Sequence, residues 1–353
     1  MTGRVSGPEP PQPTASPPPP VIHKPHWKWL IIWYFFLGGI AGGSYAIGSI
    51  ADIAGGARFR ALVRASRYLS LATLLPCPLL LILDLRRPER FLNMLRVIKL
   101  RSPMSIGVWT LLGFSGFSAF SATGQMALDG LLGARGGVLA RLPLRLIGAL
   151  GLPFGLLLSG YTGVLLGATA VPLWARNARL LGPLFLTSSV SAASAALSLL
   201  LLVTRPKSYA WHSVTQIERF CALAELGLLA SMHIRSGDLA NPLLRGKLLG
   251  AYVGGAVGCG VIIPVSIGRL GSPSHPHPRW AAALGSTLTL VGGFALKFAV
   301  VMAGRHSADD PQVALSLAAT PPPPSSTAAD RNHRHLDLCS APSIPTSNPA
   351  QPR

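Results

Sequence analysis

Four ionisable side chains lie where lipid would surround them. Glu225 is inside CALAELGLLASMHI and Lys297 inside GGFALKFAVVMAG, while Asp52 and Arg67 lie near the ends of other apolar stretches. A charge at bilayer depth is costly, so such residues are usually paired or line a pathway for protons or ions. For Glu225 and Lys297 two interpretations stay open: one buried pair that joins two helices, or members of a proton relay.

Three further side chains could bind the oxygen atoms of a quinone head group. Tyr161 is a phenol inside the apolar segment LLLSGYTGVLLG, and His23 and His26 come just before the first apolar stretch. A buried Tyr hydroxyl normally finds a hydrogen-bond partner, and His exchanges protons near neutral pH. Residue type alone favours a plainer interpretation, in which Tyr161 packs against a neighbouring helix and both His lie at the membrane interface.

The histidines and cysteines do not form the patterns that haem or iron–sulfur clusters require. Haem in a helical bundle is held by His on facing helices, and of nine His only His233 lies well inside an apolar stretch. No CxxC pair occurs among the four cysteines, which are Cys77, Cys221, Cys259 and Cys339. Because a cluster needs four thiolates at close spacing, we expect neither haem nor an iron–sulfur cluster in this chain, and no disulfide framework.

These residues belong to a chain that is too apolar for a soluble domain. Of its 353 residues, 49% are hydrophobic and 12% are charged, and that charged share is about half the usual one for soluble domains. The formal net charge is +19, but the basic residues lie mostly between apolar stretches, where they set topology and contact lipid head groups. The composition therefore indicates a multi-pass protein in a lipid bilayer and argues against nucleic-acid binding.

Eight apolar segments have the length of a membrane-spanning helix, which needs about 20 residues. They are approximately 29–51, 62–83, 105–127, 145–167, 183–203, 217–235, 246–267 and 280–303. Backbone in lipid must satisfy its hydrogen bonds internally, and the long runs lack alternation, so the predicted fold class is an all-α integral membrane protein. An even number of spans puts the start of the first span, the connector after the second and the end of the fourth on one side.

The membrane domain is predicted at residues 27–304, between two tails of different composition. Residues 1–26 and 305–353 are rich in Pro, with PPPP at 17–20 and at 321–324. Such runs favour polyproline II or disorder, so we predict disordered tails. No early apolar segment with a small-residue cleavage site precedes the first span, which is therefore expected to act as an uncleaved insertion signal.

Glycines recur four residues apart in several of the predicted spans. The pairs are Gly38 with Gly42, Gly39 with Gly43, Gly163 with Gly167, and Gly254 with Gly258. In lipid this spacing lets two helix backbones approach closely. We expect the pairs to serve helix packing rather than to line a substrate channel.

The connector after the second span is unusually charged. DLRRPERFLNMLRVIKLRSPMSIGVW, residues 84–109, holds six Lys or Arg and two acids in a short run. It resembles the corresponding loop of the NrfD/polysulfide-reductase membrane-subunit family, in which an acid-x-x-x-Pro-Glu-Arg-Phe run precedes a Ser-Pro-Met-Ser segment. The matching residues are Asp84, Pro88, Glu89, Arg90, Phe91, Ser102, Pro103, Met104 and Ser105.

Three other segments are similar to the same family, and they occur in the family's order. WYFFLGGIAGGSYAIG looks like its first helix, and GYTGVLLGATAVPLW at 160–174 is similar to its fourth-helix signature. GGFALKFAVVMAG resembles its last helix, with Lys297 where an arginine is common. The similarity runs from about residue 27 to 305, so that only the tails lie outside it.

The resemblance implies two four-helix bundles in the bacterial cytoplasmic membrane and a subunit of a quinone-linked respiratory oxidoreductase complex. Family members carry no metal or haem, and they bind menaquinone or ubiquinone in the first bundle near the membrane surface. They exchange electrons with a ferredoxin-like iron–sulfur subunit. A molybdopterin or multihaem catalytic subunit completes many such complexes.

Three groups of functional residues follow from this resemblance together with the residue types. The quinone-site residues, in contact with the head group or bracing it, are expected to be His23, His26, Tyr161, Asp84 and Arg90. The residues that dock the iron–sulfur subunit are expected to be Arg86, Arg87 and Arg96. A proton path in the second bundle is expected to use Glu225, Lys297, His233 and Asp129. For the basic cluster, a lipid-facing loop remains the alternative.

Two functions of other classes stay open. A secondary transporter uses broken helices at the midplane of the membrane, and prolines inside the predicted spans are compatible with breaks: Pro76, Pro78, Pro153 and Pro264. Uptake by the isolated chain would favour that function. A purely structural anchor would show no bound quinone on extraction. No constellation of nucleophile or metal ligands indicates a stand-alone hydrolase or metalloenzyme.

Overall fold

The structure is a computed structural model, and it describes the membrane domain with short gaps. The described residues are 29–85, 96, 99, 102–133, 136–204, 208–237, 243–244, 246–270 and 279–307. The two predicted tails therefore lie almost wholly outside the described residues. Most of the charged connector at 86–101 lies outside them as well.

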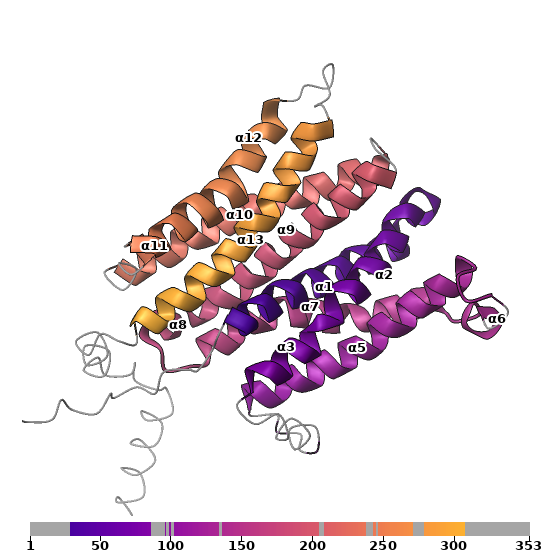
Figure 1. The fold of residues 1–353 in the computed structure, drawn as a ribbon, viewed down its shortest axis with the longest axis horizontal. Coiled ribbons are helices and arrows are strands. Elements are labelled where there is room, and N and C mark those ends of the chain that lie inside the picture. Colours follow the sequence, from indigo (N-terminus) through magenta and orange to yellow (C-terminus); the bar gives the residue numbers. More distant parts are fainter. Residues whose placement is uncertain are drawn as a thin grey trace, which may run out of the picture.

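The first half of the domain consists of helices that run back and forth beside one another (Figure 1). They are α1 (Trp29–Ala54), η1 (Gly56–Phe59), α2 (Arg60–Leu74), α3 (Pro76–Asp84), α5 (Pro103–Leu128), α6 (Gly136–Leu139) and α7 (Leu144–Gly167). α1 packs against α2, α3 and α7, and α5 packs against α2 and α7. We call this group the first bundle.

The second half forms a neighbouring group of long helices. They are α8 (Pro172–Arg176), α9 (Ala178–Thr204), α10 (Tyr209–Ser236), α11 (Gly246–Leu249), η4 (Gly250–Ile262), α12 (Ile263–Leu270) and α13 (Arg279–Ser307). α9 packs against α10 and α13, and α13 packs against η4 and α12. We call this group the second bundle. α9 also packs against α1 and α7, so it joins the two bundles, as Figure 1 shows.

The alternating direction of the long helices gives the domain two ends. α1 begins and α13 finishes at the same end, together with the last residues of α3, α7 and α10 and the first residues of α5 (Figure 1). We call this end the terminal side, and the other end, where α1 finishes and α13 begins, the opposite side. The start of α1, the end of α3, the start of α5 and the end of α7 thus lie on one side, as predicted for these span ends.

Seven helical stretches of the described residues are long and apolar enough to cross a membrane, with Gly56–Asp84 (η1, α2 and α3) and Gly250–Ile267 (η4 and most of α12) counting as one each, so the chain is a multi-pass membrane protein. The count of eight is not confirmed, because the span predicted at 217–235 lies in α10, which is not among the seven. α10 has 28 residues and would extend about 42 Å, which exceeds the bilayer core. Four charged residues lower its hydropathy: Glu218, Arg219, Glu225 and Arg235. The two Glu are the carboxylates among them. Both of these carboxylates are buried against other helices.

Glycines permit close helix contacts, as predicted for the first and fourth spans. A Cβ atom at Gly42 would overlap the carbonyl oxygen of Gly155 in α7, and one at Gly163 would overlap that of Leu181 in α9. The pairing predicted in the seventh span is wrong in register, because a Cβ at Gly254 would meet nothing within 4 Å. Gly260 instead lies against the backbone of Gly292 in α13.

The prolines named for possible helix breaks have different positions. Pro153 lies inside α7, which continues from Leu144 to Gly167. Pro76 starts α3, where its missing N–H separates that helix from α2. Pro264 follows η4, a stretch wound as a π-helix that continues directly into α12. Most of these helices therefore remain continuous across the domain.

Candidate functional site

Tyr161 fastens the end of α7 to the start of α5. It lies in the last two turns of α7, near the terminal side, and is 5% exposed. Its hydroxyl donates a hydrogen bond to the carbonyl oxygen of Pro103, in the first turn of α5. Gly107, one turn farther along α5, lies so close to the Tyr161 ring that a Cβ there would overlap it.

A second buried phenol, which the sequence patterns did not single out, lies beside Tyr161. Tyr34 of α1 is 4% exposed, and it is close enough to Tyr161 and to the thiol of Cys77 for electrostatic interaction. The Cys77 thiol donates a hydrogen bond to the carbonyl oxygen of Thr73 at 3.3 Å. Polar groups from α1, α3 and α7 therefore meet inside the first bundle near the terminal side.

A cavity of about 370 Å³ lies on the other side of the first turns of α5. Its lining residues are Lys99, Ser105, Ile106, Trp109, Thr110, Leu112, Gly113 and Phe154. Ile106 and Leu112 are exposed on the outer surface of the bundle, so the cavity is at the face that meets lipid. Its volume falls in the range of about 300–1,000 Å³ that is usual for small-molecule sites.

Trp109, one of the lining residues, has a polar group without a partner among the described residues. Its indole Nε1 is buried and has no hydrogen-bond partner in the described part of the protein. A buried polar group without a partner costs free energy, and a bound acceptor is one explanation for it. Tyr161 does not line this cavity. It holds the opposite face of the same helical turns, and its hydroxyl is already bonded.

The other residues predicted for the quinone and docking sites are only partly described. His23, His26, Arg86, Arg87 and Arg90 lie outside the described residues. Asp84 ends α3 on the terminal side and is half-buried, and Arg96 is exposed. The structure thus brings Asp84 and Tyr161 to one side of the membrane, with the charged connector between α3 and α5.

Glu225 and Lys297 are both buried in the second bundle, at 3% and 0% exposure. They interact through a hydroxyl rather than in direct contact. Lys297 Nζ donates a hydrogen bond to Ser188 Oγ of α9 at 3.3 Å, and the Ser188 hydroxyl also interacts with the Glu225 carboxylate. The two charges also attract each other electrostatically. Ser188 of α9, Glu225 of α10 and Lys297 of α13 thereby form one buried polar cluster that joins the three helices.

The other two residues predicted for the proton path lie apart from this cluster. His233 follows Glu225 by eight residues on α10, about 12 Å along the axis. Its Nδ1 is buried and has no hydrogen-bond partner among the residues the structure describes. Asp129 does not lie in the second bundle at all. It is at the end of α5 on the opposite side, 2.8 Å from Nε of Arg64.

Asp129 belongs instead to a paired network at the opposite end of the first bundle. Tyr68 and Gln125 donate hydrogen bonds to its carboxylate. Arg67 donates to Gln125 Oε1 and to Asp52 Oδ2, both at 2.7 Å. Asp52 and Arg67, noted in the sequence as charges at span ends, therefore neutralise each other.

Glu218 is a buried carboxylate that the sequence patterns did not bring out. It lies on α10 and is 7% exposed. The signal was present in the spacing, since Glu218 precedes Glu225 by seven residues, which places both on one face of the helix. Within the described residues, no group of three or more His, Cys, Asp or Glu is arranged to hold a metal ion.

These features define a class: a multi-pass helical membrane protein with a ligand-sized cavity near one surface and buried charges in its second bundle. Residues 21–307 match the family "Polysulphide reductase, NrfD", and the protein belongs to this family. It is 26% identical over 303 residues to the C subunit of polysulfide reductase from Wolinella succinogenes. That alignment covers 79% of the present sequence and 94% of the relative. The resemblance found in the charged connector is thus confirmed.

Proposed function

We propose that this protein is the membrane subunit of a respiratory oxidoreductase complex and that it exchanges electrons between quinone and an iron–sulfur partner subunit. Membership of the NrfD family supports this, as does the likeness to the C subunit of a polysulfide reductase. The observation that carries the proposal is the cavity beside the first turns of α5. It combines a lipid-facing opening, a suitable volume and the unpartnered indole N–H of Trp109.

The residues of the cavity fit a quinone head group. Such a ring has two carbonyl oxygens that accept hydrogen bonds, and it needs apolar walls for the remainder of its surface. Ile106, Leu112 and Phe154 supply apolar wall, and Trp109 supplies a donor. Lys99 and Ser105, also in the lining, add polar groups at the edge nearest the terminal side. When bound, quinone supplies the two-electron, two-proton redox chemistry that the side chains of this protein lack.

In this proposal the protein's own residues bind, orient and exchange protons. The Trp109 indole donates to one oxygen, and a histidine of the segment before α1, His23 or His26, holds the other. Tyr161 acts by fastening the first turn of α5, and so it positions the wall of the cavity. Asp84 and Arg90 brace the same region. Protons leave to water on the terminal side, and the basic connector with Arg86, Arg87 and Arg96 meets the iron–sulfur subunit.

The second bundle supplies the proton path in this proposal. Glu225, Ser188 and Lys297 form a buried polar cluster in which either the carboxylate or the amine can hold a proton. Asp129 has no part in it, because its carboxylate is paired with Arg64 in the other bundle. His233, on the same helix as Glu225, lies toward the terminal side.

Titration of a quinone-site inhibitor into the purified complex tests the quinone site. Trp109→Phe removes the indole donor and keeps an aromatic wall, so we expect about fivefold weaker binding, the value of one hydrogen bond. The matched control is Trp280→Phe, which alters an exposed Trp at the start of α13. Unchanged inhibitor affinity and unchanged quinol oxidation in Trp109→Phe would remove this cavity from the proposal.

A further inference from the structure

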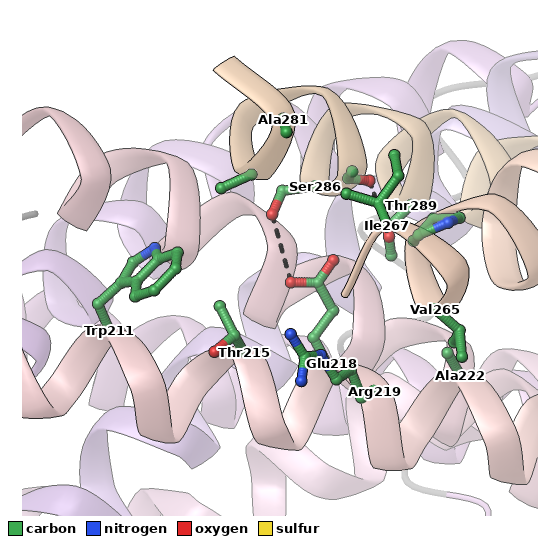
Figure 2. Close-up of a pocket in the computed structure, with 13 residues that line it drawn as sticks. Trp211, Thr215, Glu218, Arg219, Ala222, Val265, Ile267, Ala281, Ser286 and Thr289 are labelled. Carbon is green, nitrogen blue, oxygen red and sulfur yellow. Dashed lines mark hydrogen bonds between the residues drawn. The ribbon is translucent and has the colours of Figure 1, made fainter. Parts of the chain in front are cut away.

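A small cavity opens in the second bundle, on the opposite side of the membrane from the proposed quinone site. It lies between α10, α12 and α13, as Figure 2 shows, and has a volume of about 50 Å³. That is too small for a quinone or a typical organic ligand, which needs roughly 300 Å³ or more. It is large enough for about three water molecules, since each needs on the order of 10–15 Å³.

Glu218 is the buried acid of this cavity. Its Oε2 accepts a hydrogen bond from Ser286 Oγ of α13 at 3.3 Å. Thr289, one turn farther along α13, also interacts with the carboxylate. Figure 2 shows the Glu218 side chain extending from α10 toward these two hydroxyls. A carboxylate flanked by hydroxyls and water can gain and lose a proton without leaving its place.

No second acid or direct counter-ion neutralises Glu218 among the residues that line the cavity. The lining residues from α12 and α13 are uncharged: Pro264, Val265, Ile267, Ala281, Ala282, Gly285, Ser286 and Thr289. From α10, Arg219 is the other charged lining residue; it is exposed, and it interacts electrostatically with the Glu218 carboxylate without forming an ion pair in the described residues. Trp211 is also in the lining, and its indole Nε1 is buried and lacks a hydrogen-bond partner in the described residues.

Two rows of residues, one on α10 and one on α13, lead from this cavity to the buried polar cluster of Ser188, Glu225 and Lys297. On α10, Glu225 follows Glu218 by seven residues, about 10 Å along the same face. On α13, Ser286, Thr289 and Lys297 recur at helical spacing, with Gly293 between the last two. A Cβ atom at Gly293 would lie 3.7 Å from Ser188 Oγ, so the glycine faces the hydroxyl that joins Glu225 and Lys297. The two rows face each other across the bundle.

We infer that Glu218 is a proton-exchange site that connects the second bundle with water on the opposite side of the membrane. The carboxylate takes one proton from a cavity water, and that water regains a proton from hydronium in the bulk water on the opposite side. The neutral carboxyl group returns to its charged form when its proton passes toward the Glu225 carboxylate. Charge and atoms balance in each direction, and no further reactant is needed. The inference deepens the proposed proton path and rests on it only for the role of Glu225.

Labelling with a hydrophobic carbodiimide tests this directly, because the reagent adds only to protonated carboxyl groups that are reachable from a membrane. In the intact complex we expect Glu218 to be modified, with a rate that falls about tenfold per pH unit once the group is mostly ionised. Peptide mass spectrometry locates the adduct. Asp129, paired with Arg64, should stay unmodified. Absence of an adduct on Glu218 would overturn the inference.

Two variants separate this site from the proposed quinone site. Glu218→Gln keeps a hydrogen-bonding partner for Ser286, and we expect it to abolish quinol-linked proton uptake from the opposite side while inhibitor affinity at the quinone site is unchanged. Gln216→Ala, an exposed residue on the same helix, is the control. Full proton uptake in Glu218→Gln contradicts the inference and leaves the quinone site intact. Protection of Glu218 by sodium but not potassium ions would instead identify a sodium site and overturn the inference.

Discussion

The two bundles treat their charged residues in different ways. In the first bundle two direct ion pairs lie at the opposite end: Arg67 contacts Asp52 at 2.7 Å, and Arg64 contacts Asp129 at 2.8 Å. In the second bundle Glu225 and Lys297 are buried deep in the domain and meet through Ser188. Direct pairs are suited to holding helices together. Charges that are bridged by a hydroxyl can change their protonation. The proposal that the second bundle, and not the first, carries the proton path depends on this difference.

The largest expected effect comes from breaking the bridged pair in the second bundle. Lys297→Met leaves the Glu225 carboxylate buried without a countercharge, which we expect to lower the free energy of unfolding by about 3–5 kcal/mol. Unfolding of the complex in mixed micelles measures it, with the exposed Arg279→Met on the same helix as control. The double variant Lys297→Met with Glu225→Gln should recover most of the loss. A double variant as unstable as Lys297→Met would show that the two charges do not depend on each other.

Breaking the direct pair in the first bundle should cost less. Arg67→Met removes hydrogen bonds to Asp52 and Gln125, and because the Asp52 side chain is 29% exposed, water can replace part of the loss. We expect the free energy of unfolding to fall by about 2 kcal/mol, with quinol-linked proton uptake retained. Arg60→Met, an exposed residue of α2, is the control. Loss of proton uptake in a folded Arg67→Met complex would place a proton path in the first bundle.

The smallest expected effect concerns Tyr161. Tyr161→Phe removes the hydrogen bond to Pro103 and keeps the ring against Gly107, so the cavity wall should loosen without collapsing. We expect quinone-site inhibitor affinity to fall about threefold to fivefold, and His26→Ala to give a loss of similar size. Tyr209→Phe, at an exposed Tyr on α10, should change nothing. Unchanged affinity in both Tyr161→Phe and His26→Ala would remove these residues from the site.

Much of the candidate site was predictable, but its contacts were not. Tyr161, Glu225 and Lys297 stood out in the sequence because polar side chains are rare in apolar stretches. Trp109 and Tyr34 did not, since aromatic residues are ordinary in membrane helices. Their importance depends on a missing hydrogen-bond partner in one case and on a neighbouring phenol in the other. Asp129 was predicted for the proton path of the second bundle, but it ends α5 in the first bundle and pairs with Arg64, a contact that the sequence does not show.

The sequence by itself determined that this protein is a bundle of membrane-crossing helices of the NrfD type, and it predicted the start of α1, the charged connector and the end of α7 on one side. The physical reason is local: backbone in lipid must form helices, and each needs about 20 apolar residues. Only the tertiary structure decided which charges neutralise each other. It also decided that Tyr161 binds a backbone carbonyl beside a cavity, and that Glu218 meets Ser286. Those contacts join residues far apart in the sequence, and side-chain packing between helices selects them.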